Sequence, residues 1–174
     1  TLRRRVDREL IRARLRSAVT AGPQCADLAQ AVERVLKTLA RTPRGEEVHW
    51  VTDMPDGAMV AVRDDDLTEL IGNLLDNSGK WAKTTVRVTV SQDAAVHLCI
   101  EDDGPGVPEH QLERLGERGV RLDQQTHGYG LGLAIAHDII EAYGGSMGFT
   151  RSALGGLAVK VQFRVPRGND GRDA

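Results

Sequence analysis

The sequence predicts an α+β fold, a two-layer sandwich in which helices cover one face of a mixed, mostly antiparallel sheet. Two observations predict it. Stretches of alternating apolar and polar residues, typical of strands with one buried face, come in neighbouring pairs. Longer stretches with apolar residues at helical spacing separate these pairs, so strands and helices do not alternate singly as they do in a parallel sheet.

The composition indicates one domain of ordinary size. Of the 174 residues, 40% are hydrophobic, enough for a core, and 3% are aromatic, so aliphatic side chains must fill it. The net charge of −2 does not indicate a nucleic-acid partner. Cys25 and Cys99 give neither a disulfide framework nor a metal motif, which suits a reducing compartment, and Cys99 is expected in the core. No signal peptide or long apolar run occurs.

Residues 1–20 are expected to belong to a helical region of a longer protein. Their pattern predicts a helix with apolar residues on one side and arginines around the rest, either solvated or part of a coiled-coil seam. Seven Arg against Asp7 and Glu9 give residues 1–16 a charge of +5, which leaves −7 for the remainder of a chain at −2. Nucleic-acid binding by this helix is not favoured, because no interleaved aromatics or groove-reading motif accompany the arginines.

The predicted main domain covers residues 21–166, and residues 167–174 are expected to be a disordered tail. Its first half is predicted as helix, two strands and helix. Leucine and valine at helical spacing predict the first helix, the turn Pro55-Asp56-Gly57 separates the strands, and three consecutive aspartates offer an N-cap and an acidic first turn to the second helix. These elements are expected at residues 27–41, 48–51, 59–62 and 69–82.

The second half is predicted as two pairs of strands separated by a helix. Strict alternation of valine, leucine and isoleucine with polar residues predicts the first pair as a hairpin with one buried face. A short helical turn at residues 109–114 precedes residues 115–128, which lose the apolar periodicity and are therefore predicted to form a mobile loop of a functional kind. The strands are expected at residues 85–90, 96–100, 147–150 and 157–165, and the helix at residues 131–142.

The helix over residues 69–82 carries a polar stripe. Glu69, Asn73 and Asn77 lie at i, i+4 and i+8, and Lys80 follows on nearly the same stripe. Asparagine is a poor helix former because its amide competes with the backbone, so two of them in line with a carboxylate and an ammonium group need a reason. Together they could hold a hard cation and the phosphates beside it. An ordinary solvated face is the alternative that this stretch alone leaves open.

Two glycine motifs favour the first interpretation. Asp102-x-Gly104-x-Gly106 follows a buried strand, where a carboxylate can accept a hydrogen bond from an exocyclic amine, as in adenine, and glycines let the backbone approach a flat ligand. An ordinary turn is the alternative. Gly128-Tyr129-Gly130-Leu131-Gly132 opens a helix, whose N–H groups can face an anion. The second motif is neither the dinucleotide fingerprint nor a phosphate loop, and the His-Arg-Asp loop of eukaryotic-type protein kinases is absent.

The three motifs together, in this order, resemble the ATP-binding domain of bacterial two-component sensor histidine kinases. That family shares the Bergerat fold with type II topoisomerases, mismatch-repair ATPases and the ninety-kilodalton heat-shock chaperones. Glu69-x-x-x-Asn73-x-x-x-Asn77 matches its N box, Asp102–Gly106 its first glycine box and Gly128–Gly132 its second. The resemblance covers roughly residues 48–165, and Asn77, Lys80 and Trp81 favour the histidine-kinase branch over the topoisomerase-like branch.

The resemblance implies a role for each matching residue. Asn73 would coordinate Mg²⁺ bridging the phosphates of ATP, and Asn77 and Lys80 would contact the triphosphate. Asp102 would bind the adenine amino group, while Gly104 and Gly106 make room for the base. The residues expected to wrap the phosphates are Gly128, Tyr129, Gly130, Leu131 and Gly132.

The resemblance also implies three catalytic residues, Glu69, Lys80 and Arg121. Glu69 would polarise the phosphoryl acceptor or position a water. Arg121, with Arg118 as the less favoured alternative, would reach the γ-phosphate from the lid over the site.

Two parts of the family's pattern are missing. The phenylalanine-containing F box is not recognisable, since residues 115–121 occupy its place. The phosphoacceptor motif is also absent: of the five histidines only His137 is followed by an acid, and Glu141 and Ala142 then break the pattern, so we expect His137 to be a partly exposed helix residue. The acceptor is expected upstream, and residues 1–20 would be the end of the second helix of the dimerisation bundle that carries it.

The function that the resemblance implies is transfer of the γ-phosphoryl group of Mg-ATP to a histidine on that upstream domain, in two-component signal transduction. The chemistry would be chiefly positioning and charge neutralisation. The implied partners are a response-regulator receiver domain and a second copy of the full-length protein in a homodimer, with the domain on the cytoplasmic side of an inner-membrane protein. The alternatives are an ATPase clamp of the same superfamily, in which Glu69 activates water, and a non-catalytic nucleotide-binding regulatory module.

Overall fold

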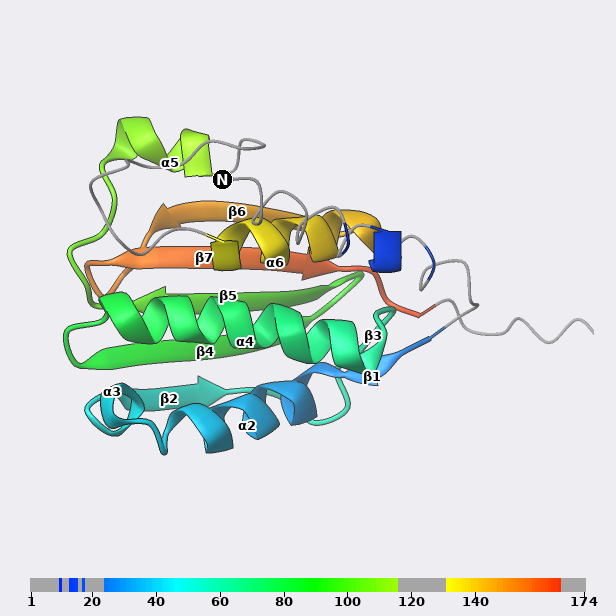
Figure 1. Cartoon of the computed structure of the whole chain (residues 1–174), viewed down its shortest axis with the longest axis horizontal. Coiled ribbons are helices and arrows are strands. Elements are labelled where there is room, and N and C mark those ends of the chain that lie inside the picture. Colours follow the sequence, from blue (N-terminus) through cyan, green and yellow to red (C-terminus); the bar gives the residue numbers. More distant parts are fainter. Residues whose placement is uncertain (1–9, 11–12, 16, 18–23, 116–130, 167–174) are drawn as a thin grey trace, which may run out of the picture.

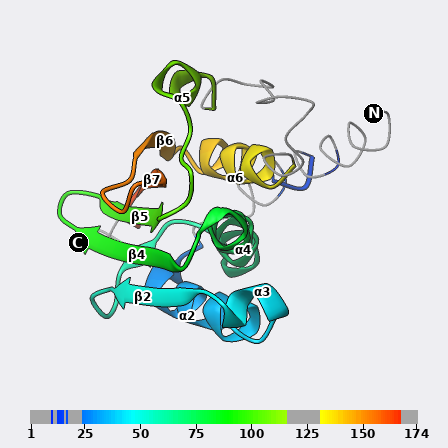
Figure 2. The ribbon, with the colours of Figure 1, turned by 90° about the vertical axis from the view of Figure 1, so that its left-hand side faces the viewer.

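The computed structural model describes residues 10, 13–15, 17, 24–115 and 131–166. This part of the chain forms two layers, a five-stranded sheet and helices that cover one of its faces (Figures 1 and 2). The predicted two-layer fold with a mixed, mostly antiparallel sheet is therefore confirmed. The predicted domain boundaries, the tail over residues 167–174 and the loop over residues 115–128, apart from the helical Leu115, fall outside the described residues or at their limits and stay predictions.

The main sheet has the order β2-β4-β5-β7-β6. Three of its four strand pairs are antiparallel, and β2 runs parallel to β4. The strands are β2 (His49–Asp53), β4 (Thr85–Gln92), β5 (Val96–Asp102), β6 (Ser146–Arg151) and β7 (Leu157–Phe163). The predicted hairpins of β4 with β5 and of β6 with β7 are confirmed.

The expectation that all strands come in hairpins was wrong for the first pair. β3 (Met59–Val60) does not pair with β2 but with β1 (Ala26–Asp27), in a separate two-stranded sheet. The reason lies next to β3: Ala58 and Val60 are fully buried, and the Ala58 carbonyl accepts a hydrogen bond of 3.0 Å from the N–H of Leu28. The segment therefore packs under the first long helix, and β2 takes its backbone partners from β4.

Five helices are described: α2 (Leu28–Leu39), α3 (Pro43–Glu46), α4 (Asp64–Trp81), α5 (Glu109–Leu115) and α6 (Leu131–Ala142). The short helical turn predicted at residues 109–114 is thus confirmed as α5. α4 starts earlier than predicted, with Arg63 at its N-cap and no side-chain cap, so the expected aspartate cap was wrong. Asp64, Asp65 and Asp66 instead form the predicted acidic first turn, which suits the positive end of the helix dipole.

The core lies between the sheet and the helices, and α4 runs through its middle, with α2 on one side and α6 on the other (Figure 1). Five apolar side chains of α4 are fully buried there, namely Leu67, Leu70, Ile71, Leu74 and Leu75. On β5 every second residue is buried, which places Leu98 and Ile100 inward and leaves Cys99 half-buried on the opposite face, so its predicted core position was wrong. No helix in the described part of the chain combines the length and the apolarity needed to cross a membrane.

We predict that Leu74→Ala lowers the free energy of unfolding by about 2–5 kcal/mol, because it leaves a cavity at the centre of the core. Urea denaturation followed by circular dichroism measures this change. Glu33→Ala, at an exposed position of α2, is the matched control and should change the free energy by less than about 0.5 kcal/mol. A loss below about 1 kcal/mol for Leu74→Ala would contradict the central place given to α4.

Candidate functional site

The polar stripe of α4 faces the start of α6. A Cβ added at Gly132 would lie 3.1 Å from Oδ1 of Asn73, so the backbone of the second glycine motif lies directly against this amide. The Nδ2 group of Asn73 donates a hydrogen bond of 2.8 Å to the carbonyl of Glu69, one turn earlier. Asn73 therefore presents its oxygen, the atom that a hard cation prefers, to the N-terminal end of α6.

Asn77 is buried one turn further along α4. Its residue is 6% exposed, and its Nδ2 atom has no hydrogen-bond partner among the described residues. A buried donor without an acceptor destabilises a protein by about 1–3 kcal/mol. An oxygen-rich ligand beside α4 would satisfy this donor, which fits the predicted contact with a triphosphate.

The first glycine motif begins with a buried carboxylate. Asp102 ends β5 and is 2% exposed. Its Oδ1 atom accepts hydrogen bonds from the N–H groups of Gly104, at 2.9 Å, and Leu157, at 3.2 Å. Burial raises the pKa of Asp102, while these two hydrogen bonds oppose the rise and the nearby Asp103 adds to it. Both hydrogen bonds from described residues end on Oδ1, and none of them uses Oδ2.

Close backbone approaches surround this carboxylate. A Cβ on Gly104 would lie 2.3 Å from the carbonyl oxygen of Trp81, at the end of α4, and one on Gly156 would lie 2.0 Å from Oδ1 of Asp102. Gly106 has a φ of 71°, a backbone angle that residues with a side chain rarely adopt. Only glycine fits these positions. Gly156 was not predicted, because it lies in the turn between β6 and β7, outside the three motifs.

The described parts of the three motifs therefore lie along α4. The first glycine motif meets its C-terminal end, and the start of α6 meets its middle. Five predicted site residues fall outside the described residues: Arg118, Arg121, Gly128, Tyr129 and Gly130. The side chain of Leu131 is not described either, so its predicted contact also stays a prediction.

The two remaining charged candidates have protein partners. Oε2 of Glu69 lies 2.5 Å from Nη2 of Arg14, which also lies 3.0 Å from Oδ1 of the fully buried Asp66. The hydroxyl of Tyr143 donates to the other oxygen of Asp66 at 2.5 Å, and burial followed by this hydrogen bond raises the pKa of Tyr143 to about 12. Sequence reasoning gave no sign of this cluster, since its members lie far apart along the chain.

Lys80 does not point toward Asn77 in the structure. Its Nζ atom lies 2.5 Å from Oδ2 of Asp76, and both side chains are largely exposed. The pair borders a cavity of about 350 Å³ on the flank of α4 that faces α3 and β2, away from α6. Arg44, Trp50 and Gly79 contribute to the lining of this cavity.

His137 is half-buried on α6, as predicted for a residue without a phosphoacceptor role. With Asp138 and Glu141 it forms a group whose ligand atoms lie within 4.8 Å of one another. Asp138 and Glu141 each have another interaction in the structure, so this grouping alone does not indicate a metal site.

Comparison with known proteins identifies the family. A family model described as histidine kinase-, DNA gyrase B-, and HSP90-like ATPase matches residues 62–169. The chain is 41% identical over 174 residues to the sensor protein kinase CarS of Pseudomonas aeruginosa, a match that covers 99% of this chain and 38% of CarS. It is 39% identical over 137 residues to the two-component sensor PhoQ of the same species, covering 78% of this chain and 31% of PhoQ.

Solved structures agree with this assignment. The mycobacterial sensor histidine kinase MprB superposes with a TM-score of 0.70 and 25% sequence identity, covering 82% of this chain and 97% of the MprB chain. The region matched by the family model covers more than half of the sequence and contains the N box and both glycine boxes. The chain therefore belongs to the histidine kinase-, DNA gyrase B- and HSP90-like ATPase family, as an ATP-binding domain of the sensor histidine kinase branch.

Proposed function

We propose that this domain binds Mg-ATP between α4, α6 and the turn after β5, and transfers the γ-phosphoryl group to a histidine on an upstream dimerisation domain. The observation that carries the proposal is the convergence of the motifs on α4, where Gly104 lies against the carbonyl of Trp81 and Gly132 lies against Asn73. Each contact leaves no room for a side chain, so the backbones of both glycine motifs lie directly against α4.

The base would bind at the C-terminal end of α4. Oδ2 of Asp102 would accept a hydrogen bond from the adenine amino group, and Gly104 and Gly106 would leave room for the ring. Because a buried carboxylate that loses its donor is destabilised, a base with an oxo group in place of the amine should bind less tightly.

The phosphates would lie between Asn77 and the start of α6. Nδ2 of Asn77 supplies a buried donor, and the N–H groups at the N-terminus of a helix such as α6, which have no acceptor within the helix, favour anions. Lys80 would join them by leaving Asp76 and turning from the flank of α4 that borders α3 toward the phosphates. The ion pair that it leaves is exposed and contributes only about 0–1 kcal/mol.

The donor set at Asn73 fits magnesium, which takes oxygen ligands and keeps most of its waters. Asn73 would hold the ion through Oδ1, while its Nδ2 stays bonded to the Glu69 carbonyl. The bound ion would neutralise charge on the phosphates, and Lys80 and Arg121 would add positive charge near the transferred group.

The ion pair between Glu69 and Arg14 bears equally on transfer to a histidine and on hydrolysis. An ATPase clamp needs this carboxylate free to activate water, but Arg14 holds it in an ion pair of 2.5 Å. Polarisation of a phosphoryl acceptor by Glu69 would likewise require release from Arg14.

The wider context is proposed from the relatives. Two-component sensor is the description of the Pseudomonas aeruginosa PhoQ, and the present chain spans only 31% of its length. We propose that this domain acts within a homodimer, on the cytoplasmic side of an inner-membrane protein, and that a response-regulator receiver domain takes the phosphoryl group from the histidine.

The proposal is tested by mixing this domain with the separately expressed upstream helical region and γ-labelled ATP. We expect label on the helical region in a form that acid releases and base does not, as for phosphohistidine. Replacing the acceptor histidine of that region is the control. Steady phosphate release by this domain alone, without label on the helical region, would favour an ATPase instead.

For Asp102→Asn, we predict that ATP binding weakens by about 1–3 kcal/mol, or roughly five- to 150-fold, because the amide offers a weaker acceptor to the adenine amine. Titration calorimetry measures the dissociation constant. Asp93→Asn is the control, since Asp93 accepts a backbone N–H at the opposite end of the same hairpin. An unchanged ATP affinity would place the base elsewhere.

For Asn73→Ala, we predict that the affinity for ATP no longer depends on Mg²⁺, because the protein ligand to the ion is gone. Asn77→Ala should instead weaken binding by a similar factor with and without Mg²⁺, since it removes a donor to the phosphates. Calorimetric titrations with Mg²⁺ and with EDTA separate the two. If the affinity of Asn73→Ala for ATP still depended fully on Mg²⁺, the metal would have to be held by another residue.

A further inference from the structure

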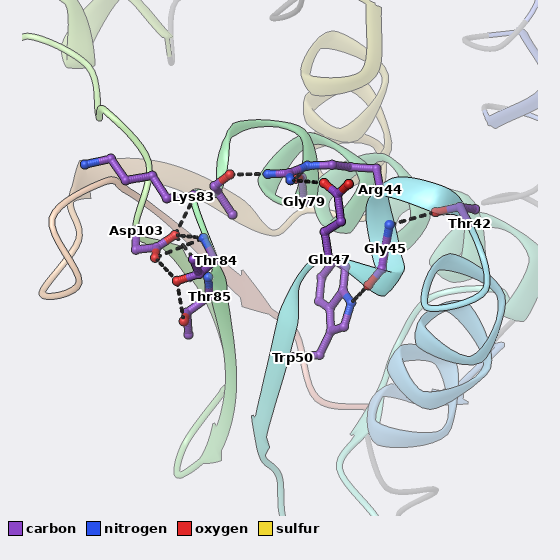
Figure 3. Close-up of polar contacts among 11 residues, drawn as sticks. Thr42, Arg44, Gly45, Glu47, Trp50, Gly79, Lys83, Thr84, Thr85 and Asp103 are labelled. Carbon is purple, nitrogen blue, oxygen red and sulfur yellow. Dashed lines mark hydrogen bonds and ion pairs between the residues drawn. The ribbon is translucent and has the colours of Figure 1, made fainter.

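The turn that joins α4 to β4 is held on two sides by side chains that the three motifs do not include. Its residues, Ala82 to Thr84, lie between Trp81, whose carbonyl meets Gly104, and the first residue of β4. Figure 3 shows Asp103 on one side of this turn and Arg44 on the other. We propose that Asp103 and Arg44 are positioning residues that set adenine specificity by fixing this turn against the base site, an inference that rests on the proposed nucleotide binding.

Asp103 fastens the backbone that follows α4. Its Oδ1 atom accepts hydrogen bonds from the N–H groups of Lys83, at 2.7 Å, and of Thr84 and Thr85, both at 3.1 Å. Its Oδ2 atom accepts from the hydroxyl of Thr84 at 2.7 Å and from the N–H of Thr84 at 3.1 Å. Burial opposes the charge of Asp103, but the hydrogen bonds from this turn outweigh it and hold the pKa well below its usual value.

These hydrogen bonds occupy both oxygens of Asp103, so its carboxylate is turned to the protein backbone and not to a ligand. In return, the N–H of Asp103 donates to the carbonyl of Thr85 at 3.2 Å. Asp103 stands between Asp102, which would read the base, and Gly104, which touches the end of α4. The position of the Asp102 carboxylate relative to α4 therefore depends on the hydrogen bonds between Asp103 and the turn.

Arg44 fastens the last turn of α4 from the other side. The carbonyls at a helix end have no donors within the helix, and Arg44 supplies them. Its Nε donates to the carbonyl of Gly79 at 3.0 Å, and its Nη2 donates to the carbonyl of Ala82. A cation at this end also suits the helix dipole. Arg44 is oriented in turn by Glu47, whose carboxylate accepts from Nη1 at 2.8 Å.

Hydrogen bonds also hold the segment that carries Arg44 in place. Thr42 caps α3 by accepting the N–H of Gly45 at 3.0 Å, and the indole of Trp50 donates to the Gly45 carbonyl at 3.0 Å (Figure 3). A Cβ on Gly79 would lie 3.0 Å from the Trp50 ring, so β2 also lies close to the end of α4. Arg44 thus connects the end of α4 to α3, which is held in turn by Thr42 and by Trp50 of β2.

Loosening this turn should affect base recognition more than phosphate binding. A hydrogen bond to the adenine amine weakens steeply once donor and acceptor move apart, because its geometry is narrow. The contacts to phosphates come from a long lysine side chain, a metal ion and a helix end, which tolerate a small shift. The measured quantity is therefore the ratio of the dissociation constants for ITP and ATP, since inosine has an oxo group where adenine has its amine.

The experiment measures this ratio by calorimetry for the unaltered domain and for five variants. We expect Asp103→Ala to lower the ITP-to-ATP ratio by roughly tenfold, through weaker ATP binding. Asp103→Asn should restore most of the ratio, because the amide oxygen can still accept the three N–H groups on Oδ1. Arg44→Met, which keeps the apolar stem and removes the donors, should lower the ratio in the same direction.

Asp93→Ala is the matched control. It removes a carboxylate that accepts the N–H of Ala95 at 2.9 Å in the distal turn of the β4–β5 hairpin, and it should leave the ratio unchanged. Thermal unfolding identifies the temperature at which all variants are folded. If Asp103→Ala does not fold, Arg44→Met and Thr84→Val, which removes only the hydroxyl bonded to Asp103, decide the question.

A ratio within twofold of the unaltered domain in folded Asp103→Ala or folded Arg44→Met would overturn the inference. A loss of stability with an unchanged ratio would do the same, because it shows a purely structural role. Failure of the unaltered domain to bind either nucleotide would contradict the proposed function itself, and the inference would fall with it.

Discussion

The arrangement depends on one close approach between two backbones. The peptide of Gly104 lies so near the carbonyl of Trp81 that a Cβ would come within 2.3 Å of that oxygen. Because β5 delivers Asp102 immediately before this point, the approach places a buried carboxylate beside the end of α4. A second close approach comes from the β6–β7 turn. A Cβ on Gly156 would lie against Oδ1 of the Asp102 carboxylate, so this position also excludes a side chain. Glycine is required on both sides of Asp102 for a steric reason, before any ligand is considered.

The two ends of α4 differ in charge and in what holds them. Three aspartates form its first turn, where the N–H groups make the potential positive. Asp66 is fully buried there and is neutralised by Arg14 and Arg63 and hydrogen-bonded by Tyr143. Arg44 binds the carbonyls at the other end. The helix is therefore fixed at both termini by long-range contacts, so the side chains between them keep a constant relation to α6 and β5.

Local patterns predicted most of this fold, and non-local pairing was where they failed. Alternation in β4 and β5 predicted their hairpin, because partners joined by a short turn leave little choice. The parallel pairing of β2 with β4 spans a whole helix, and no pattern within β2 distinguishes it from pairing with β3. The first glycine motif predicted that Asp102, Gly104 and Gly106 belong to the candidate site. Gly156 and the Arg14 contact to Glu69 were missed for the same reason as the β2 pairing, since the chain brings them to the site from far away.

The polar stripe of α4 shows what burial adds to a sequence pattern. A solvated stripe would leave its amides in water, where an unpaired donor has no consequence. Lys80 is largely exposed and pairs with Asp76, whereas Asn77 is 6% exposed and its donor has no partner among the described residues. A buried donor left without an acceptor destabilises a protein by about 1–3 kcal/mol, and an acceptor on a ligand would remove that destabilisation. Binding of the proposed oxygen-rich ligand beside Asn77 should therefore raise the stability of the domain.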